Sequence, residues 1–423
     1  MLDIKLLRKN AKEIEAKLKT KDPSVDLSKA IALDERIRDI KTRVEQLKAA
    51  KNERSGEIGT LKRQGKDVSA IMAVVDQHAD EIQSLDKELI GLEEQYKHEI
   101  GCLPNIPMDG IKVSQSPLDN VMIKEVGKKP TFDFPFKNHL ELNEKLNIFD
   151  FKRGVKLAGA GWPVYRGLGA RLEWALINYM LSIHIKNGFE QWMPPAVVRP
   201  DVMYSSGQLP KFKGQQFEIK DDTFNLFLIP TAEISLNGLH IDEVIQEEDL
   251  PLRYTAYTPC FRREAGAAGS QERGLIRTHQ FNKVEMFCYT KPEDSDKMFE
   301  SMLQSAEEVL QGLGLHYRNM LLVTGDMSFA AARTVDVEVW LPGQNRYYEV
   351  SSVSNCTDFQ SRRSNIKYRK KDEKPELVHT LNGSGLATSR LMVGILENNQ
   401  NADGSVNIPA VLQPYLGGIK KLG

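Results

Sequence analysis

Residues 29–99 constrain the fold more than any other stretch, because they contain no proline and no aromatic residue except Tyr96. Apolar residues recur there at alternating steps of four and three, the heptad pattern of a helix that packs against another helix. The first run consists of Leu33, Ile37, Ile40, Val44, Leu47, Ile58 and Leu61. Gly65-Lys66-Asp67 ends this run. The second run begins with Met72, Val75, Ala79 and Ile82. We predict an antiparallel coiled-coil arm about 50 Å long, at about 1.5 Å per residue.

An arm of this kind has little interior, so its charges rather than a pocket decide its role. Residues 29–66 contain eleven basic and six acidic side chains, whereas residues 67–100 contain two basic and nine acidic ones. The helices therefore pair their charges with each other, or the surplus bases contact nucleic-acid phosphates. The bases nearest the predicted tip are Arg54, Lys62, Arg63 and Lys66.

The remaining composition is that of a globular, intracellular protein. The 423 residues carry 57 Lys and Arg against 58 Asp and Glu, so no global field attracts polyanions. The four cysteines show neither CxxC pairing nor zinc spacing, which predicts a reducing cytoplasm and no zinc. We find no secretory or membrane-spanning segment in the sequence. A proline-rich linker near residue 104 predicts two domains, 1–104 and 105–423, of which the second mixes strand and helix signals.

The segment from Phe261 to Phe287 is the strongest candidate for a binding site. Tyr254–Phe261 and Gln280–Tyr289 are predicted strands, joined by a loop rich in glycine and charge. Alternation along extended backbone places Arg262 with Glu264 on one face. It places Arg277, His279, Phe281, Lys283 and Glu285 on one face as well. Guanidinium for phosphate, a ring for a base and a carboxylate for an ammonium suit a nucleotide beside an amine. The alternative is a surface loop whose charges only pair with one another.

Two more segments add chemistry to this hairpin. Asn382–Gly385 is predicted as a tight loop whose glycines let a backbone approach a ligand, with Arg390 in the helix that follows. Sharp helix entry is the alternative explanation of those glycines. A predicted hairpin around Pro342-Gly343 carries Glu349 and Ser352, hard oxygen ligands that suit Mg²⁺ unless Glu349 is simply exposed.

One segment upstream has a structural signature. Leu172, Leu176, Tyr179, Met180 and Ile183 have helical spacing. Asn187-Gly188 ends that helix, and a short strand runs into Pro194-Pro195. A long apolar helix beside an edge strand is a common way to form a dimer interface.

In this order, the segments resemble motifs 1, 2 and 3 of class II aminoacyl-tRNA synthetases. Motif 1 ends at Pro195, motif 2 is Phe261-Arg262-Arg263-Glu264 and motif 3 is Gly383-x-Gly385-xxxx-Arg390. Over its whole length the chain resembles the bacterial-type seryl-tRNA synthetases. The matching strings are SSGQLPKF (205–212), IPTAE (229–233), RGLIRTHQFNKVE (273–285) and NCTDFQSRR (355–363), together with the N-terminal arm.

The resemblance implies an α+β fold, a class II antiparallel sheet flanked by helices and preceded by the coiled-coil arm. It implies catalytic roles for Arg262, Arg390 and Glu349. It implies ATP contacts by Arg262, Arg263, Glu264, Arg277, Phe281, Glu349, Val350, Ser351, Ser352 and Arg390. It implies serine contacts by Thr231, Ala232, Glu233, Arg262, Glu285, Asn382 and Ser384. It places Mg²⁺ on Glu349 and Ser352, and gives the bases near the arm's tip a tRNA contact.

The implied activity is ATP-dependent attachment of L-serine to tRNA(Ser) in two steps, with tRNA(Sec) as a further candidate substrate. The implied assembly is a homodimer with tRNA crossing between subunits. Two alternatives stay open: transfer of an activated amino acid to a carrier protein, and an interaction protein with an inactive synthetase-like domain. The sequence departs from the family pattern at Arg263, where we expect a small residue, and at Ser270-Gln271, where a basic residue is common.

Overall fold

The computed structural model describes residues 1–264 and 274–423. The chain forms two compact units, each described by itself below. The first, here the arm unit, consists of Leu2–Ala16 and Ser24–Leu103. The second, here the sheet unit, consists of Met1, Lys17–Pro23 and Pro104–Gly423.

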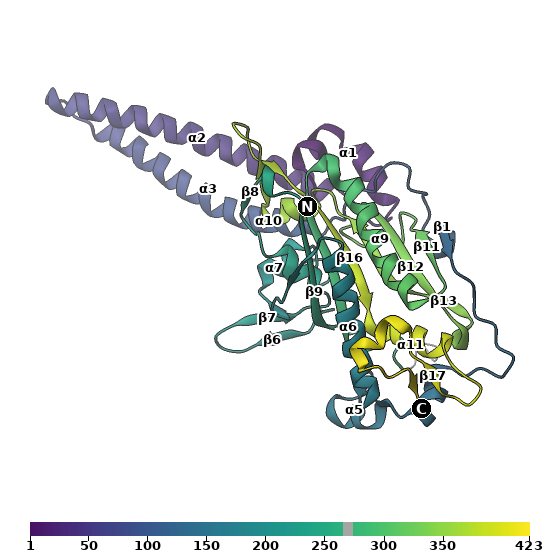
Figure 1. Cartoon of the computed structure of the whole chain (residues 1–423). Helices are drawn as coiled ribbons and strands as arrows, with labels where there is room; N and C mark the ends of the chain where they lie inside the picture. Colours follow the sequence, from purple (N-terminus) through teal and green to yellow (C-terminus); the bar gives the residue numbers. More distant parts are fainter. Residues whose placement is uncertain (265–273) are drawn as a thin grey trace. The chain divides into compact units, whose positions relative to one another are not determined.

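The predicted coiled-coil arm is confirmed. Helices α2 (Ser28–Arg63) and α3 (Ser69–Gly101) run antiparallel along each other, joined by a short turn in which Gly65 has a φ of +72° (Figure 1). Glycine adopts this left-handed backbone at little cost, which explains why the helix ends there. Helix α1 (Ile4–Lys19), interrupted at Asn10, comes before the pair.

Apolar burial in the arm is concentrated in the half that lies away from the turn, although Val68 beside the turn is also buried. On α2 the seam is buried from Ala30 to Leu47, whereas Ile58 and Leu61 are only partly buried. On α3 the prediction was wrong at Met72, which is 42% exposed because the half-buried Ile71 occupies the inner face. Ion pairs between the helices are Lys29–Glu99, Arg36–Glu88, Lys41–Glu93 and Arg43–Glu81. Charge pairing therefore holds for this half of the arm.

The sheet unit is built on an eight-stranded sheet of the described residues, in the order β1-β11-β12-β13-β16-β10-β9-β4. The strands are β1 (Val121–Val126), β11 (Tyr317–Leu321), β12 (Arg333–Leu341), β13 (Arg346–Asn355), β16 (His379–Ala387), β10 (Gln280–Thr290), β9 (Leu252–Phe261) and β4 (Glu190–Trp192). Neighbours are antiparallel except β4, which pairs in parallel with β9 at one edge. The predicted α+β fold is confirmed.

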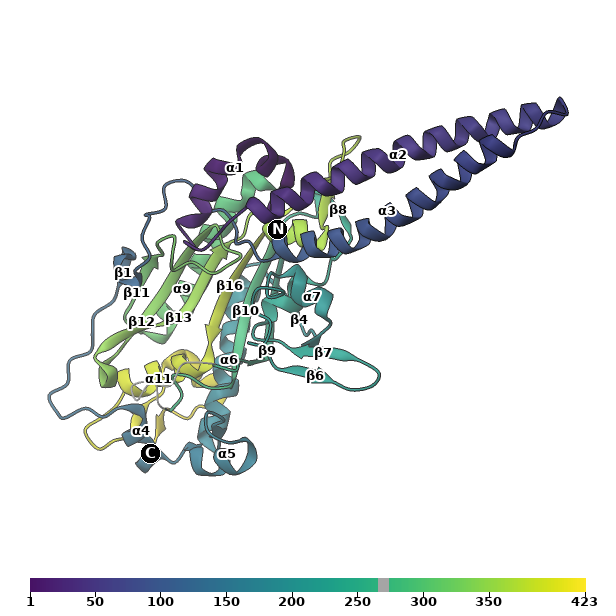
Figure 2. The same ribbon diagram turned by 180° about the vertical axis from the view of Figure 1, so that it is seen from behind.

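Three helices pack on one face of the sheet: α6 (Leu168–Lys186), α9 (Ser295–Leu313) and α11 (Thr388–Asn398) (Figures 1 and 2). Alternation turns Val284, Met286 and Cys288 of β10 into this core, together with the valines of β12. The alternate side chains Lys283 and Glu285, on either side of Val284, point to the opposite face, where the candidate site lies.

Smaller elements complete the sheet unit. The further helices are α4 (His139–Leu146), α5 (Phe151–Ala158), α7 (Pro200–Ser205), α8 (Ala232–Asn237) and α10 (Phe359–Ser364). The further strands are β2 (Phe149–Asp150), β3 (Val164–Tyr165), β5 (Val197–Val198), β6 (Glu218–Lys220), β7 (Asn225–Leu228), β8 (Val244–Gln246), β14 (Lys367–Arg369), β15 (Glu376–Leu377), β17 (Val406–Asn407) and β18 (Lys421–Leu422). Among the described helices, none combines the length and apolar character that a membrane span requires.

Candidate active site

A cavity of about 570 Å³ opens on the polar face of the sheet. A smaller pocket continues it, and the two share Arg262, Glu264, Arg277, Lys283, Glu349 and Ser384. Segments far apart in sequence therefore meet at one site, as predicted. The predicted residues that line it are Thr231, Glu233, Arg262, Arg263, Glu264, Arg277, Phe281, Glu285, Glu349, Val350, Ser352, Asn382, Ser384 and Arg390.

Two predicted residues have side chains outside this cavity. Ala232 is fully buried in an apolar cluster with Tyr254 and Phe287. Ser351 is also buried, and its hydroxyl donates a 2.6 Å hydrogen bond to the carbonyl of Ser384. These two side chains contribute to packing, because neither faces the cavity.

The two strands of the motif 2 hairpin are confirmed, but they end earlier than the predicted pattern of faces requires. The antiparallel register pairs Phe261 with Gln280 at the end of the ladder. Arg262 and Glu264 therefore lie beyond β9, and Glu264 has a φ of +45°. Arg277 and His279 lie before β10, so they share no strand face with Phe281, Lys283 and Glu285. Arg277 nevertheless lines the joined cavity and pocket with these three residues, as expected, whereas His279 does not.

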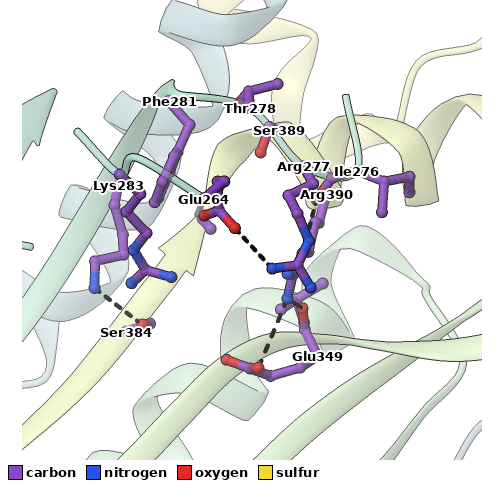
Figure 3. Close-up of a pocket in the computed structure, with 13 residues that line it drawn as sticks. Glu264, Ile276, Arg277, Thr278, Phe281, Lys283, Glu349, Ser384, Ser389 and Arg390 are labelled. Carbon is purple, nitrogen blue, oxygen red and sulfur yellow. Dashed lines mark hydrogen bonds and ion pairs between the residues drawn. The ribbon is translucent and has the colours of Figure 1, made fainter. Parts of the chain in front are cut away.

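Cations and an aromatic ring line the smaller pocket (Figure 3). The Arg262 guanidinium lies 5.2 Å from the centre of the Phe281 ring. Arg277 NH1 donates to Glu264 Oε2 at 2.7 Å, and Arg390 NH1 donates to the backbone carbonyl of Glu349 at 2.7 Å. In Figure 3 Phe281 and Lys283 lie on one side of the pocket, with Arg277 and Arg390 on the other. A planar group fits beside the ring while the guanidinium groups face an anion.

Carboxylates line the deeper part of the larger cavity. Glu285 of β10 is 2% exposed. Its Oε2 accepts a 2.9 Å hydrogen bond from Thr231 Oγ1 and forms an ion pair with Lys283. Lys283 also contacts Ser384 Oγ at 3.5 Å, across the register that pairs Glu285 with Ser384. Lys283 received no role from the sequence, although its alternation with Phe281 and Glu285 already placed it on their face.

A second carboxylate, Glu233, lies close to Glu285. Glu233 Oε1 accepts hydrogen bonds from Gln360 Nε2 at 2.7 Å and from Asn382 Nδ2 at 3.2 Å. Burial, and then repulsion by Glu285, raise the pKa of Glu233 to about 7. Two acids in one cavity suit a ligand that brings a positive charge. Gln360 was missed, because no periodicity marks it as facing the site.

The predicted loop at Asn382–Gly385 was wrong, because these residues belong to strand β16. Asn382 and Gly383 pair with β10 on one side and β13 on the other. A Cβ on Gly383 would lie 3.2 Å from Val353, and one on Gly385 would lie 2.4 Å from His184 Nε2. The glycines therefore admit neighbouring side chains of the protein rather than a ligand. Arg390 lies in the first turn of α11, as predicted.

The donors predicted for Mg²⁺ have a suitable environment. The Glu349 side chain is 44% exposed, and Ser352 lines the same cavity. Opposite Ser352 on β12, Asp336 bonds to its hydroxyl, while Asp336 Oδ1 is buried without a hydrogen-bond partner among the described residues. Burial, and then repulsion by Glu349, raise the pKa of Asp336 well above its usual value. Hard oxygen donors with surplus negative charge fit a divalent cation that takes its other ligands from phosphate and water.

The remaining predicted residues have other surroundings or lie in the arm unit. Arg263 lines the cavity, but its NH1 donates to the carbonyl of Gly214 at 2.7 Å. Ser270 and Gln271 lie outside the described residues. In the arm unit, Arg54 and Arg63 of α2 and Lys62 and Lys66 near the turn are all exposed.

Comparison with known proteins decides the family. Residues 1–107 match the family model of the seryl-tRNA synthetase N-terminal domain, and residues 216–399 match the tRNA synthetase class II core domain (G, H, P, S and T). The chain is 51% identical over 422 residues to a serine–tRNA ligase of Chlamydia pneumoniae, covering 100% of this chain and 99% of that one. The chain belongs to the seryl-tRNA synthetase family.

Solved structures of this family agree in fold. The seryl-tRNA synthetase of Pyrococcus horikoshii, solved with ATP, has a TM-score of 0.93 and 36% identity, covering 100% of this chain and 99% of that one. The cytoplasmic serine–tRNA ligase of Naegleria fowleri, solved with AMP, has a TM-score of 0.87 and 29% identity, covering 100% and 98%. The resemblance to seryl-tRNA synthetases inferred from the motifs is thus confirmed over the whole chain.

Proposed function

We propose that this seryl-tRNA synthetase attaches L-serine to tRNA(Ser) in two steps within the cavity described above. The observation that carries the proposal is the junction of two opposite environments. Arginines and an aromatic ring line the smaller pocket, and the carboxylates Glu233 and Glu285 line the larger cavity. A nucleotide triphosphate and an amino acid ammonium need these two environments side by side.

In the first step a serine carboxylate oxygen attacks the α-phosphorus of ATP, forming seryl-adenylate as the bond to pyrophosphate breaks. Arg262 holds the α-phosphate and the serine carboxylate, while Phe281 and Arg390 enclose the adenine. Arg277 and Arg390 face the β- and γ-phosphates, and Glu264 contacts the nucleotide. Positioning and neutralisation of the developing charge carry most of this step. Bound to Glu349 and Ser352, Mg²⁺ would neutralise phosphate charge.

Serine recognition follows from hydrogen bonding at the buried end. Thr231, Glu233, Glu285, Asn382 and Ser384 surround the amino acid, and Glu285 supplies the carboxylate for its polar groups. Alanine would leave such partners unpaired, which rejects it strongly. Threonine is excluded by space alone, a discrimination of about 1–3 kcal/mol per extra carbon.

In the second step the 3′-terminal ribose hydroxyl of the tRNA attacks the adenylate carbonyl and AMP leaves. We assign the proton of that hydroxyl to a phosphate oxygen of the adenylate, since the neighbours of His279 offer no triad. A pH–rate profile of single-turnover transfer with an ionisation that disappears in His279→Ala would contradict this assignment.

We also propose separate roles for the two predicted domains of the chain. Residues 1–104 form the tRNA-binding domain, whose exposed Arg54, Lys62, Arg63 and Lys66 contact phosphates. Residues 105–423 form the catalytic domain. The exposed Trp174 and Ile185 of α6 support a homodimer with tRNA crossing between subunits. tRNA(Sec) is a second candidate substrate.

The test is a charging assay with purified protein, ATP, Mg²⁺ and radiolabelled serine, with and without tRNA(Ser). We expect serine-dependent pyrophosphate exchange without tRNA and seryl-tRNA with it. Exchange without charging would favour transfer to a carrier protein. Inactivity in both steps would favour the interaction protein and overturn the proposal.

A further inference from the structure

One wall of the larger cavity is an irregular loop rather than a strand or helix. Ser328, Phe329 and Ala330 line the cavity that also contains Glu233 and Asn382. None of the three lines the smaller pocket around Phe281 and Arg390. The position of this loop therefore affects the amino acid end of the site more than the nucleotide end.

Two side chains from distant parts of the sequence hold this loop by its backbone. Lys21 Nζ donates to the carbonyl of Ala331 at 2.5 Å and to that of Phe329 at 3.3 Å. Asn105 Nδ2 donates to the carbonyl of Ala330 at 2.9 Å, and its backbone N–H donates to the carbonyl of Phe329 at 2.9 Å. Three successive carbonyls thus receive hydrogen bonds from residues outside the sheet.

Both holding residues are buried, which is unusual for a lysine. Lys21 is 7% exposed and Asn105 is 5% exposed. Burial lowers the pKa of the Lys21 ammonium to about 7, so desolvation opposes its charge. A lysine with a buried apolar stem and its ammonium in water would avoid this cost. The position is instead explained by the loop carbonyls that the ammonium satisfies.

The stretch that carries Lys21 also contacts a second wall of the cavity. Asp22 forms an ion pair with Lys211 at 3.3 Å, next to the wall residues Gln208 and Phe212. The Phe212 ring packs edge-to-face on Phe329, with 5.6 Å between ring centres. The two walls are therefore packed against each other and held from the same side.

We propose that Lys21 and Asn105 are positioning residues that fix the Phe329–Ala331 wall and thereby set the affinity and selectivity of the cavity for its amino acid. This inference rests on the proposed function, because it takes serine as the ligand of the larger cavity. Without these donors the carbonyls turn towards water and the wall moves. Serine then loses complementarity, and the extra methyl group of threonine gains space.

The test compares Lys21→Met and Asn105→Asp with the unmodified chain in pyrophosphate exchange. Asn105→Asp retains the Oδ1 that accepts from the N–H of Ile106 but loses the Nδ2 donors. We expect KM for serine to rise at least about fivefold, as loss of a buried hydrogen bond predicts, with KM for ATP within about twofold. Exchange with threonine should rise relative to serine. Lys21→Arg, which keeps a cationic donor, should recover part of the serine affinity.

Lys17→Met is the matched control, since Lys17 lies in the same stretch and pairs with the exposed Asp109. It should leave both KM values unchanged. Hydrogen exchange of a peptide spanning Ser328–Ala332 gives a second measurement, which should speed up in Lys21→Met and Asn105→Asp alone. An unchanged serine KM in a folded variant, or an equal rise for ATP, overturns the proposal. If Lys21→Met does not fold, Asn105→Asp decides by the same criteria.

Different results contradict the proposed function and the positioning role of Lys21 and Asn105. An unmodified chain without serine-dependent exchange contradicts the proposed function. In that case the hydrogen-exchange measurement still decides whether Lys21 and Asn105 hold the wall. Unchanged hydrogen exchange of the 328–332 peptide in both variants would contradict the positioning role.

Discussion

Arg277 NH1 lies 2.7 Å from Glu264 Oε2, and this ion pair joins the two ends of the segment that contains residues 265–273. Both side chains line the smaller pocket, on the side where Arg390 and Glu349 also meet. A guanidinium held by a carboxylate is oriented before a phosphate arrives, so less side-chain freedom is lost when it binds. The Glu264 carboxylate therefore holds Arg277 in the orientation in which it lines the pocket.

Arg277→Ala should raise KM for ATP by about tenfold, the loss of one charge-assisted contact, and leave KM for serine within about twofold. Pyrophosphate exchange at varied ATP and varied serine measures both constants. Arg318→Ala is the matched control, because Arg318 forms a 2.7 Å ion pair with Glu338 and does not line the pocket. Equal rises for both substrates would contradict the assignment of Arg277 to the nucleotide.

Glu285→Ala should abolish serine-dependent pyrophosphate exchange while the fold persists. The change removes the acceptor of Thr231 and leaves the Lys283 ammonium, 6% exposed, without its carboxylate. An unpaired buried charge destabilises by about 3–5 kcal/mol, so the far-ultraviolet spectrum must be checked at low temperature. Thr231→Val is the milder companion, because it removes one hydrogen bond and keeps the ion pair. Near-normal exchange in folded Glu285→Ala would refute the role.

Glu233 should make the free energy of unfolding depend on pH. Its folded pKa of about 7 lies above the ordinary 4.5, so the folded state binds the proton more tightly. The contribution of Glu233 is complete below pH 4.5 and is lost as pH rises towards 7. Glu233→Gln removes this term. Denaturant unfolding should therefore show the variant gaining on the unmodified chain between pH 5 and 7, by at most about 1.4 kcal/mol per pH unit. A pH-independent difference would contradict the shift.

Glu349→Ala should raise the Mg²⁺ concentration for half-maximal exchange by about tenfold or more, since a carboxylate ligand is lost. Arg390 keeps its main bond, because that bond is to the Glu349 backbone carbonyl rather than to the carboxylate. Thermal stability should therefore change little. Glu338→Ala, on the facing strand, serves as control and should leave the Mg²⁺ dependence unaltered. Excess chelator should stop exchange in every variant.

Gly385→Ala should destabilise the sheet unit by about 1–3 kcal/mol, the usual cost of overpacking. The added Cβ would lie 2.4 Å from His184 Nε2, and His184 cannot retreat because Ser305 holds its other ring nitrogen at 2.8 Å. Gly394→Ala in α11 is the matched control, since its Cβ would approach Val339, Leu315 and Leu341 no closer than 3.4 Å. Denaturant midpoints separate the two. Equal stability of both variants would show that β16 has room to shift.

Periodicity in the sequence was enough to predict the arm, the strands β9 and β10 and the helix α6, because each pattern is local. The predicted ends of β9 at Phe261 and of β10 at Gln280 are correct, but the conformation of the residues beyond them was not predictable, since it depends on contacts with other elements. The same limit explains the error at Gly383 and Gly385. Their need for small residues comes from Val353 and His184, which approach from other elements.

The residues of the candidate site were predictable from sequence to different extents, for the same reason. Charged and aromatic side chains near the hairpin were predictable from their type and alternation. Gln360 and Asp336 were not, because their roles come from neighbours across the fold: Glu233 for Gln360 and Ser352 for Asp336. Lys21 and Asn105 bond to carbonyl groups, and backbone acceptors leave no mark in a sequence.

Burial along α2 stops at Leu47, and the ion pairs between the helices extend no further than Arg43–Glu81 among those described. Opening free energy should therefore decline along the arm, with the slowest amide exchange near Ile40 and fast exchange around Gly65. The contacts that hold the two helices together therefore lie mainly in the half of the arm away from the turn. A partner that binds the outer turns adds contacts that the heptads there do not supply. Binding should therefore slow amide exchange near the tip of the arm.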